Sequence, residues 1–164
     1  MTDIVTDKPR TQSAYHAIAA LSLTWPPAWS RGGLAPWQLQ RVKTYIAEHL
    51  TTSIRISDLA ACVRLSDSYF FQAFRRSFGQ SPHGYITACR IGCAQEMMIR
   101  TNLPLTQIAL ECGLADQPHL TRLFRHHVGT SPALWRKSHQ APAARSPGDS
   151  AGIPATPTVH STAL

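Results

Sequence analysis

The middle of the chain contains an internal sequence repeat of two copies, and this repeat is the strongest constraint on its fold. Residues 56–61 (ISDLAA) align with residues 105–110 (LTQIAL) at an offset of 49. Past the following turn the offset is 50, so that Phe74-Arg75 aligns with Phe124-Arg125 and Gly79 with Gly129. A period near fifty is typical of repeat arrays. Because only two copies fit, the sequence predicts two similar units and not a solenoid.

Each copy has the outline of a helix-turn-helix. In the clearer second copy a short helical pattern precedes a turn at 112–115, and a second helical pattern runs from His119 to Val128. In proteins of this kind the second helix enters a DNA major groove. A single pattern of this kind is weak evidence for a helix-turn-helix, because ordinary αα-hairpins have much the same sequence pattern. The presence of two copies strengthens the evidence.

The segment between the copies predicts a long linker helix. We expect the first helix-turn-helix at about 56–78, the linker at about 82–101 and the second helix-turn-helix at about 105–128. At 1.5 Å per residue, a helix of roughly 18 to 20 residues spans about 27–30 Å. One turn of B-DNA is about 34 Å. Such a rod would place two reading helices in successive major grooves on one face of the DNA.

The rest of the chain divides by composition. Residues 36–50 predict a supporting helix with apolar side chains on one face. Residues 1–35 form an N-terminal arm that is expected to be partly ordered at most. Residues 139–164 are rich in Ala, Pro, Ser, Thr and Gly without periodicity, which predicts a disordered tail. Residues 36–138 are therefore the expected domain.

Caps and helix faces can also be predicted from the pattern. Side chains that accept a backbone N–H at a helix start are predicted at Ser57, Ser66, Thr106 and Asp116. The first turn has Arg64 where the second copy has Gly113, and a positive φ there would cost Arg64 about 1 kcal/mol. Inward-facing side chains of the second copy are expected to be Leu120, Phe124, His127, Val128, Leu134 and Trp135.

Charge favours a polyanionic partner. Sixteen Lys and Arg against nine Asp and Glu give a net charge of +7, and Arg exceeds Lys by thirteen to three. A basic excess suits nucleic acid or an anionic membrane surface, and arginine suits bidentate contacts to phosphate and guanine. No apolar run reaches the roughly 18 residues of a membrane span, and the first residues lack the order of a secretion signal. We therefore expect a cytoplasmic protein with reduced cysteines and no membrane partner.

A further set of residues resembles a known family. Residues 113–120 (GLADQPHL), followed by Phe124-Arg125, Gly129, Ser131-Pro132 and Trp135-Arg136, are similar to the DNA-binding domain of AraC/XylS-type transcription regulators. The resemblance covers about 100 of the 164 residues, roughly 36–137. It implies an all-α fold: a seven-helix core of two helix-turn-helix subdomains joined by a long linker helix. It also implies a double-stranded DNA-binding regulator that works without a cofactor, more often an activator than a repressor. RNA polymerase is then a partner, and the DNA-binding core can act as a monomer.

The helix faces and the resemblance together select the contact residues. Predicted base contacts are Ser68, Phe71, Gln72, Gln117, His119 and Arg122. Predicted phosphate contacts are Arg75, Arg76, Arg125, His126, Arg136 and Lys137. Pro118 departs from the pattern, because it stands at a base-facing position and its side chain cannot donate a hydrogen bond.

Other function classes are less well supported. A degenerate copy of this fold could dock on a partner regulator or on RNA polymerase without reading bases, an alternative that Pro118 and Arg64 keep open. No nucleophile–base pair or phosphate loop appears, so an enzyme is not expected. Cys89 and Cys93 share a helix face, but buried thiols are the better interpretation than a metal site. Cys62 and Cys112 each stand alone in the sequence.

Overall fold

The computed structural model describes residues 32–140, which form seven helices and no strand. Most of the expected N-terminal arm and of the expected disordered tail lies outside the described residues. The helices are α2 (Pro36–His49), α3 (Ile56–Cys62), α4 (Asp67–Phe78), α5 (Pro82–Arg100), α6 (Leu105–Glu111), α7 (Gln117–Val128) and α8 (Pro132–His139). No helix in this part of the chain is both long and apolar enough to cross a membrane.

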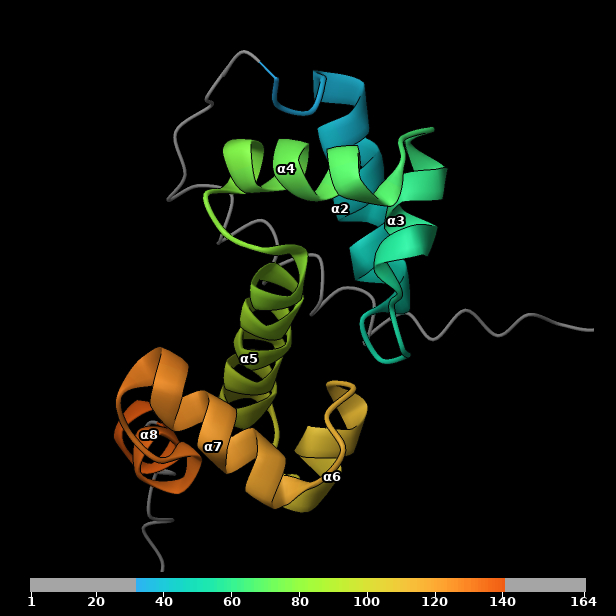
Figure 1. Cartoon of the computed structure of the whole chain (residues 1–164). Coiled ribbons are helices and arrows are strands. Elements are labelled where there is room, and N and C mark those ends of the chain that lie inside the picture. The colour runs from blue at the N-terminus through green and yellow to red at the C-terminus, as the bar shows by residue number, and fades with distance from the viewer. Residues whose placement is uncertain (1–31, 141–164) are drawn as a thin grey trace, which may run out of the picture.

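The arrangement is that of two helical units on one rod. Helices α2, α3 and α4 gather at one end of the 19-residue helix α5, and α6, α7 and α8 gather at the other end (Figure 1). Helix α3 packs on α4, and α6 packs on α7, as in two helix-turn-helix pairs. Helices α4 and α7 both lie toward the viewer in Figure 1. The predicted fold class, two helix-turn-helix subdomains joined by a long linker helix, is confirmed.

Each unit is built around aromatic side chains at equivalent positions of the repeat. Phe70 and Phe74 in α4, and Leu120 and Phe124 in α7, are fully buried. Phe74 stacks on Phe78 with ring centroids 4.2 Å apart, and Phe124 meets the edge of Trp135 at 5.8 Å. Large rings of this kind bury much apolar area and hold neighbouring helices in a fixed register. The repeat in the sequence is therefore a repeat of two small cores.

Two of the four predicted caps are correct and two are wrong. Ser66 Oγ accepts the N–H of Tyr69 at 3.4 Å, and Asp116 Oδ1 accepts the N–H of His119 at 2.7 Å. Ser57 and Thr106 are not caps, because α3 and α6 begin at Ile56 and Leu105, so that the N-cap residues are Arg55 and Pro104, two positions earlier than predicted. At α6 the N-cap residue is Pro104, which has no side-chain cap hydrogen bond.

Two predicted inward-facing residues of the second unit are exposed. Trp135 is buried, but Leu134 is 61% exposed. Successive residues of a helix point about 100° apart, so the eight-residue α8 can bury one of these two side chains but not both. His127 is exposed as well, although Phe124 is buried and Val128 half-buried. The last turn of α7 thus extends past the elements that cover its earlier turns.

The end of α2 meets both the linker helix and the second unit. Arg90 of α5 donates from Nε to the carbonyl of Leu50 at 3.0 Å and from one terminal nitrogen to the carbonyl of Thr52 at 2.7 Å. Gly113, in the second turn, has a φ of +72°, and a Cβ there would lie 2.5 Å from the Leu50 carbonyl oxygen. Only glycine allows this approach. We call the contact of residues 50–52 with Arg90 and Gly113 the junction.

The first turn has the same left-handed backbone conformation as the second, but with Arg64 in the place of Gly113. Arg64 is the only residue other than glycine with a positive φ, 58°, within residues 32–140. Its side chain is exposed. The strain of about 1 kcal/mol is therefore the cost of placing an arginine in this turn.

Substitution of glycine in the two units tests the junction. Gly113→Ala adds both left-handed strain and an overlap with Leu50, so we expect a loss of roughly 2–4 kcal/mol in the free energy of unfolding. Gly129→Ala is the matched control, because Gly129 has a φ of +83° but nothing lies within 4 Å of its Cβ position. Gly129→Ala should lower the free energy of unfolding by only about 1 kcal/mol. Urea unfolding measures both values, and equal losses would contradict the close contact at Gly113.

Candidate nucleic-acid interface

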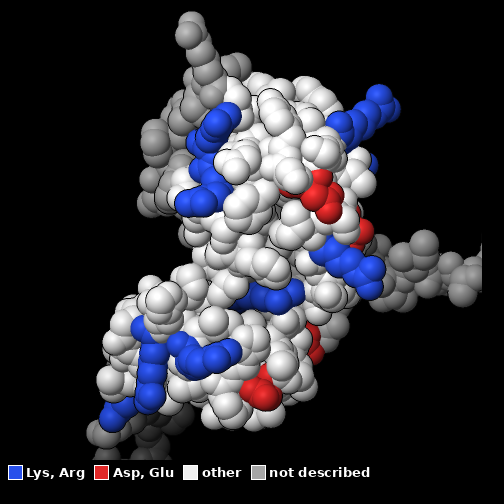
Figure 2. Space-filling view, in the orientation of Figure 1, with Lys and Arg blue, Asp and Glu red and all other residues white. Residues whose placement is uncertain are grey.

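Basic side chains cover both units on one face of the molecule. Figure 2 shows Lys and Arg side chains on both units and between them, and fewer Asp and Glu side chains on the same face. Arg75, Arg122, Arg125 and Lys137 are exposed in the structure, as is His126. Such a face suits a polyanion that runs past both units.

Two of the predicted phosphate contacts are less free than the others. Arg76 is exposed but donates to the carbonyl of Gly32 at 3.4 Å. Arg136 is half-buried, and its Nε and one terminal nitrogen are enclosed without a hydrogen-bond partner among residues 32–140. Burial lowers the pKa of Arg136. Both side chains would have to shift to meet a phosphate with their full set of donors.

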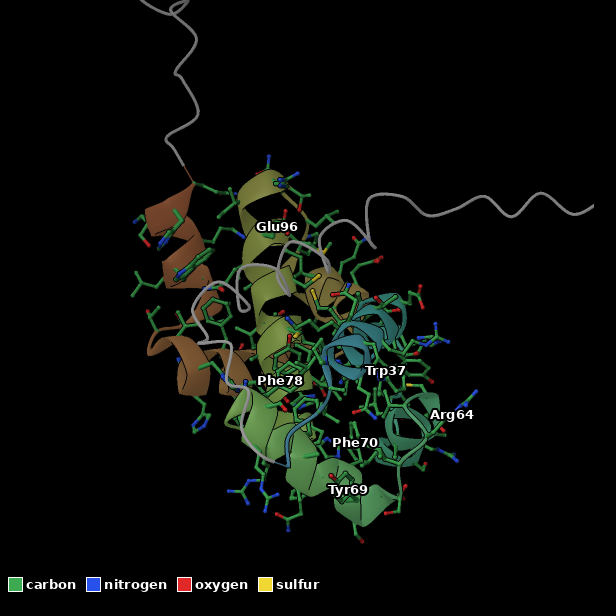
Figure 3. The ribbon with its side chains drawn as sticks, turned by 90° about the horizontal axis from the view of Figure 1, so that it is seen from above. Trp37, Arg64, Tyr69, Phe70, Phe78 and Glu96 are labelled. Carbon is green, nitrogen blue, oxygen red and sulfur yellow. The ribbon has the colours of Figure 1, made fainter. Side chains whose placement is uncertain are left out.

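Helix α4 presents a short polar face around one aromatic ring. Ser68, Phe71 and Gln72 are exposed, and Phe71 is 38% exposed. Tyr69 and Phe70 are neighbours on α4 (Figure 3), and Phe70 is fully buried whereas Tyr69 is exposed. Tyr69 is 51% exposed and is an interface candidate that the sequence analysis missed. The repeat could have found it, because Tyr69 aligns with His119 at the offset of 50.

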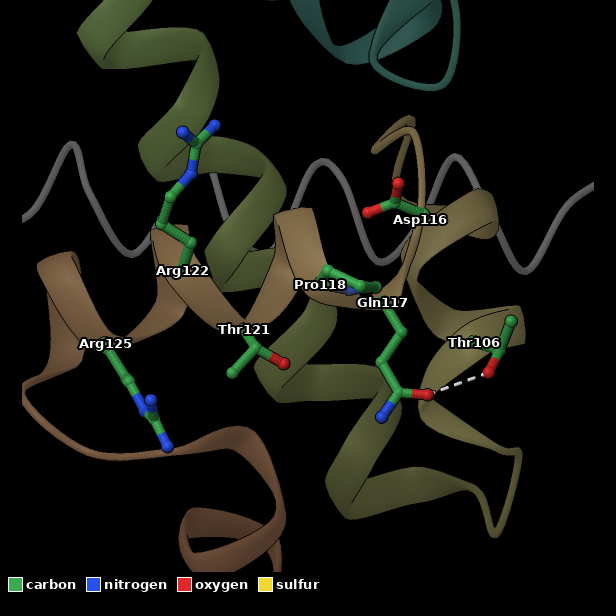
Figure 4. A pocket seen from close by; sticks show the side chains of 7 residues that line it. All are labelled: Thr106, Asp116, Gln117, Pro118, Thr121, Arg122 and Arg125. Carbon is green, nitrogen blue, oxygen red and sulfur yellow. Dashed lines mark hydrogen bonds between the residues drawn. The ribbon is translucent and has the colours of Figure 1, made fainter.

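Helix α7 borders an open hollow with a volume of about 810 Å³. Its lining residues are Thr106, Asp116, Gln117, Pro118, Thr121, Arg122 and Arg125 (Figure 4). The hollow brings together two of the predicted base contacts, Gln117 and Arg122, and one predicted phosphate contact, Arg125. It also contains Thr106 and Thr121, which the sequence analysis did not select. A concave surface with several polar groups is the usual form of a binding site.

The first turn of α7 holds its polar side chains by local hydrogen bonds. Thr106 donates from its hydroxyl to Oε1 of Gln117 at 2.8 Å. His119 is half-buried, and its Nδ1 accepts the N–H of Ala115 at 3.4 Å. The neutral imidazole therefore carries its proton on Nε2, which makes that atom a donor. Pro118 is exposed in this first turn, where a missing N–H removes no helical bond.

The acidic, histidine and cysteine side chains of residues 32–140 do not gather into a larger cluster. This part of the chain contains no group of three or more His, Cys, Asp or Glu side chains that could hold a metal ion. Cys89, Cys93 and Cys112 are buried free thiols. Contrary to the sequence analysis, Cys112 does not stand alone. It forms a thiol hydrogen bond with Cys93, and its Sγ also lies 3.7 Å from Met97 Sδ.

Burial makes these thiols poor nucleophiles. Loss of solvation raises the pKa of Cys89 to about 12. The hydrogen bond with Cys93, and then burial, raise the pKa of Cys112 well above its usual range. Because the thiolate is the reactive form, a raised pKa leaves little of it near neutral pH. Cys62 is only half-buried, and burial raises its pKa as well.

We therefore expect alkylation to distinguish the four cysteines. Iodoacetamide at pH 8 should modify Cys62 first, and should reach Cys89, Cys93 and Cys112 only at the rate of unfolding. Mass spectrometry of the labelled peptides measures the order, and labelling in denaturant, where all four should react alike, is the control. Modification of Cys112 in the folded protein as fast as Cys62 would contradict the buried thiol cluster.

Known proteins share this architecture. Residues 59–138 match the family model described as "Helix-turn-helix domain". The chain is 30% identical over 95 residues to the probable transcriptional regulator LumQ of Photobacterium leiognathi, which covers 58% of this chain and 38% of that protein. It is 29% identical over 106 residues to the melibiose operon regulatory protein of Escherichia coli K12, covering 65% and 35%. The chain thus spans about a third of the length of these curated relatives.

Solved structures agree with the relatives. The DNA-binding domain of AdpA in complex with a target DNA superimposes with a TM-score of 0.58 and 28% identity, covering 62% of this chain and 91% of that one. An AraC-type regulator structure from Chromobacterium violaceum has a TM-score of 0.60, covers 64% of this chain and 94% of that one, and at 23% identity supports the fold.

Two helix-turn-helix units on one linker helix, with polar outward faces on α4 and α7, define a bipartite helix-turn-helix domain. The matched family model, the similar proteins and the solved structures agree with this description of the domain. Residues 59–138 match a helix-turn-helix family, and the relatives and solved structures that are similar to this part of the chain include transcriptional regulators and a probable AraC family regulator.

Proposed function

We propose that this protein is a sequence-specific regulator of transcription that binds double-stranded DNA with α4 and α7. The observation that carries the proposal is the placement of these two helices at the two ends of α5, on one basic face of the molecule (Figures 1 and 2). An isolated helix-turn-helix could serve many purposes, whereas two that are joined by one linker helix support binding to two successive major grooves.

The dimensions support binding to successive major grooves. Helix α5 has 19 residues, which corresponds to about 28 Å of length. Neighbouring major grooves on one face of B-DNA recur at about 34 Å. Because one chain carries both reading helices, the DNA-binding core can act as a monomer on a non-palindromic site.

The proposed base contacts come from the exposed faces of α4 and α7. On α4 they are Ser68, Gln72 and Phe71, whose ring can meet a thymine methyl group. On α7 they are Gln117, His119 and Arg122, and Arg122 can bond O6 and N7 of guanine together. Pro118 adds an apolar surface between them.

Phosphate contacts would supply most of the affinity. Arg75, Arg125, His126 and Lys137 are exposed and available, while Arg76 and Arg136 need rearrangement. Contacts of this kind fix the position of the protein on the duplex and release counterions, so affinity should fall steeply with salt.

Activation through RNA polymerase is the regulatory outcome that we propose. One relative, the transcriptional activator NphR of Rhodococcus sp, is 30% identical over 102 residues of the chain. Bound DNA and polymerase meet inside the cell, so the proposed location is the cytoplasm. Docking on a protein partner without base contacts remains the competing function, and the following experiment separates the two.

Arg122→Ala should weaken binding to a site selected from random duplexes by about 1–3 kcal/mol and relax the preference at one base position. Arg100→Ala is the matched control: it removes the same charge from a residue that pairs with Glu96 and does not line the hollow. Fluorescence anisotropy at several salt concentrations measures both. Equal losses in the two variants, or affinity that does not change with salt, would favour the protein-docking alternative.

A further inference from the structure

We propose that Thr106 sets the base preference of α7. By holding the carbonyl oxygen of Gln117, it leaves the amino group, a hydrogen-bond donor, as the part of Gln117 that faces the DNA, so that this half of the site selects guanine over adenine. The inference rests on the proposed function and specifies the DNA sequence that the α7 surface recognises.

The first step is the orientation of the Gln117 carboxamide. The Thr106 hydroxyl donates to Gln117 Oε1 at 2.8 Å. Figure 4 shows the oxygen directed at Thr106, on α6, and the amide nitrogen directed away from it. The terminal torsion of a glutamine is broad and roughly two-fold, so a free carboxamide would sample both orientations. With the oxygen held against α6, the amino group is the part that faces an incoming base.

The second step concerns the hydrogen-bonding groups that each base presents in the major groove. Glutamine usually selects adenine in the major groove, because its oxygen accepts from N6 while its amino group donates to N7. A carboxamide whose oxygen faces α6 cannot make this pair of bonds. Guanine offers two acceptors, O6 and N7, and cytosine offers a donor. The amino group of Gln117 therefore favours guanine, and the cytosine edge is the least compatible.

The two arginines in the hollow have the same polarity, whereas Asp116 and the hydroxyl of Thr121 also offer acceptors. Arg122 has five N–H donors and no acceptor. Pro118 has no polar side-chain atom. Asp116 is the one carboxylate in the lining, and its Oδ1 accepts the N–H of His119 at 2.7 Å, which ties it to the start of α7. The Gln117 amino group and the arginines thus present donors around an apolar patch.

The first unit lacks this arrangement. In the repeat alignment Ser57 takes the position of Thr106, and Asp67 takes the position of Gln117. A carboxylate accepts hydrogen bonds and cannot donate them. The two reading helices therefore differ in polarity at the same structural position, and the two halves of the preferred site should differ in sequence.

The test is a selection of bound duplexes from random DNA with the full chain and four variants. The base position read by Gln117 is the one whose preference disappears in Gln117→Ala. At that position the wild type should prefer guanine. Thr106→Val, which keeps the shape and removes the hydroxyl, should admit adenine and lower the guanine-to-adenine ratio by about fivefold. Gln117→Glu should shift the preference to cytosine. Ser57→Ala, the matched control in the first unit, should leave this position unchanged.

The outcomes separate this inference from the proposed function. If the wild type selects no sequence above random DNA, the proposed function fails and the inference falls with it. If the wild type selects a site but prefers adenine at the Gln117 position, or Thr106→Val keeps the wild-type ratio, only the role of Thr106 is overturned. Circular dichroism checks that Thr106→Val keeps its helices; if it does not, Gln117→Glu decides, and an unchanged guanine preference in that variant contradicts the inference.

Discussion

The junction between the end of α2, Arg90 and Gly113 is the contact on which the rest of the arrangement depends. A linker helix alone fixes the distance between the two units, but it does not fix the rotation of either unit about the helix axis. Arg90 donates hydrogen bonds to the carbonyls of Leu50 and Thr52, just past the end of α2, and Gly113 brings the second turn against the same segment. Since these carbonyls would otherwise lack partners, the contact satisfies the helix end and orients the units together.

Much of the fold could be predicted because the repeat and the helical periodicity report on local packing. Leu120 and Phe124 were placed in the core by their spacing, and they are fully buried. The positive φ of Arg64 could be anticipated because a glycine stands at the aligned position in the other copy. These features depend on a few neighbours in the sequence, so periodicity and alignment detect them.

The features that could not be predicted depend on contacts between distant segments. Nothing in the sequence indicates that Gly113 lies against Leu50, or that Cys112 lies beside Cys93. Thr106 was taken for a helix cap, because a hydroxyl near a helix start usually has that role. Its hydroxyl instead reaches Gln117 across the turn, a contact that only the packing of α6 on α7 creates. The candidate base contacts themselves remain a prediction.

The central claim is that the two reading helices act as one rigid unit. The direct measurement is the affinity of the full chain for its selected site in a series of duplexes with base pairs inserted between the two half-sites. An insertion of about five base pairs turns one half-site to the opposite face of the duplex. Because the junction prevents the units from rotating independently, the affinity should drop to that of a duplex with a single half-site. Equal affinity at every spacing would contradict the account.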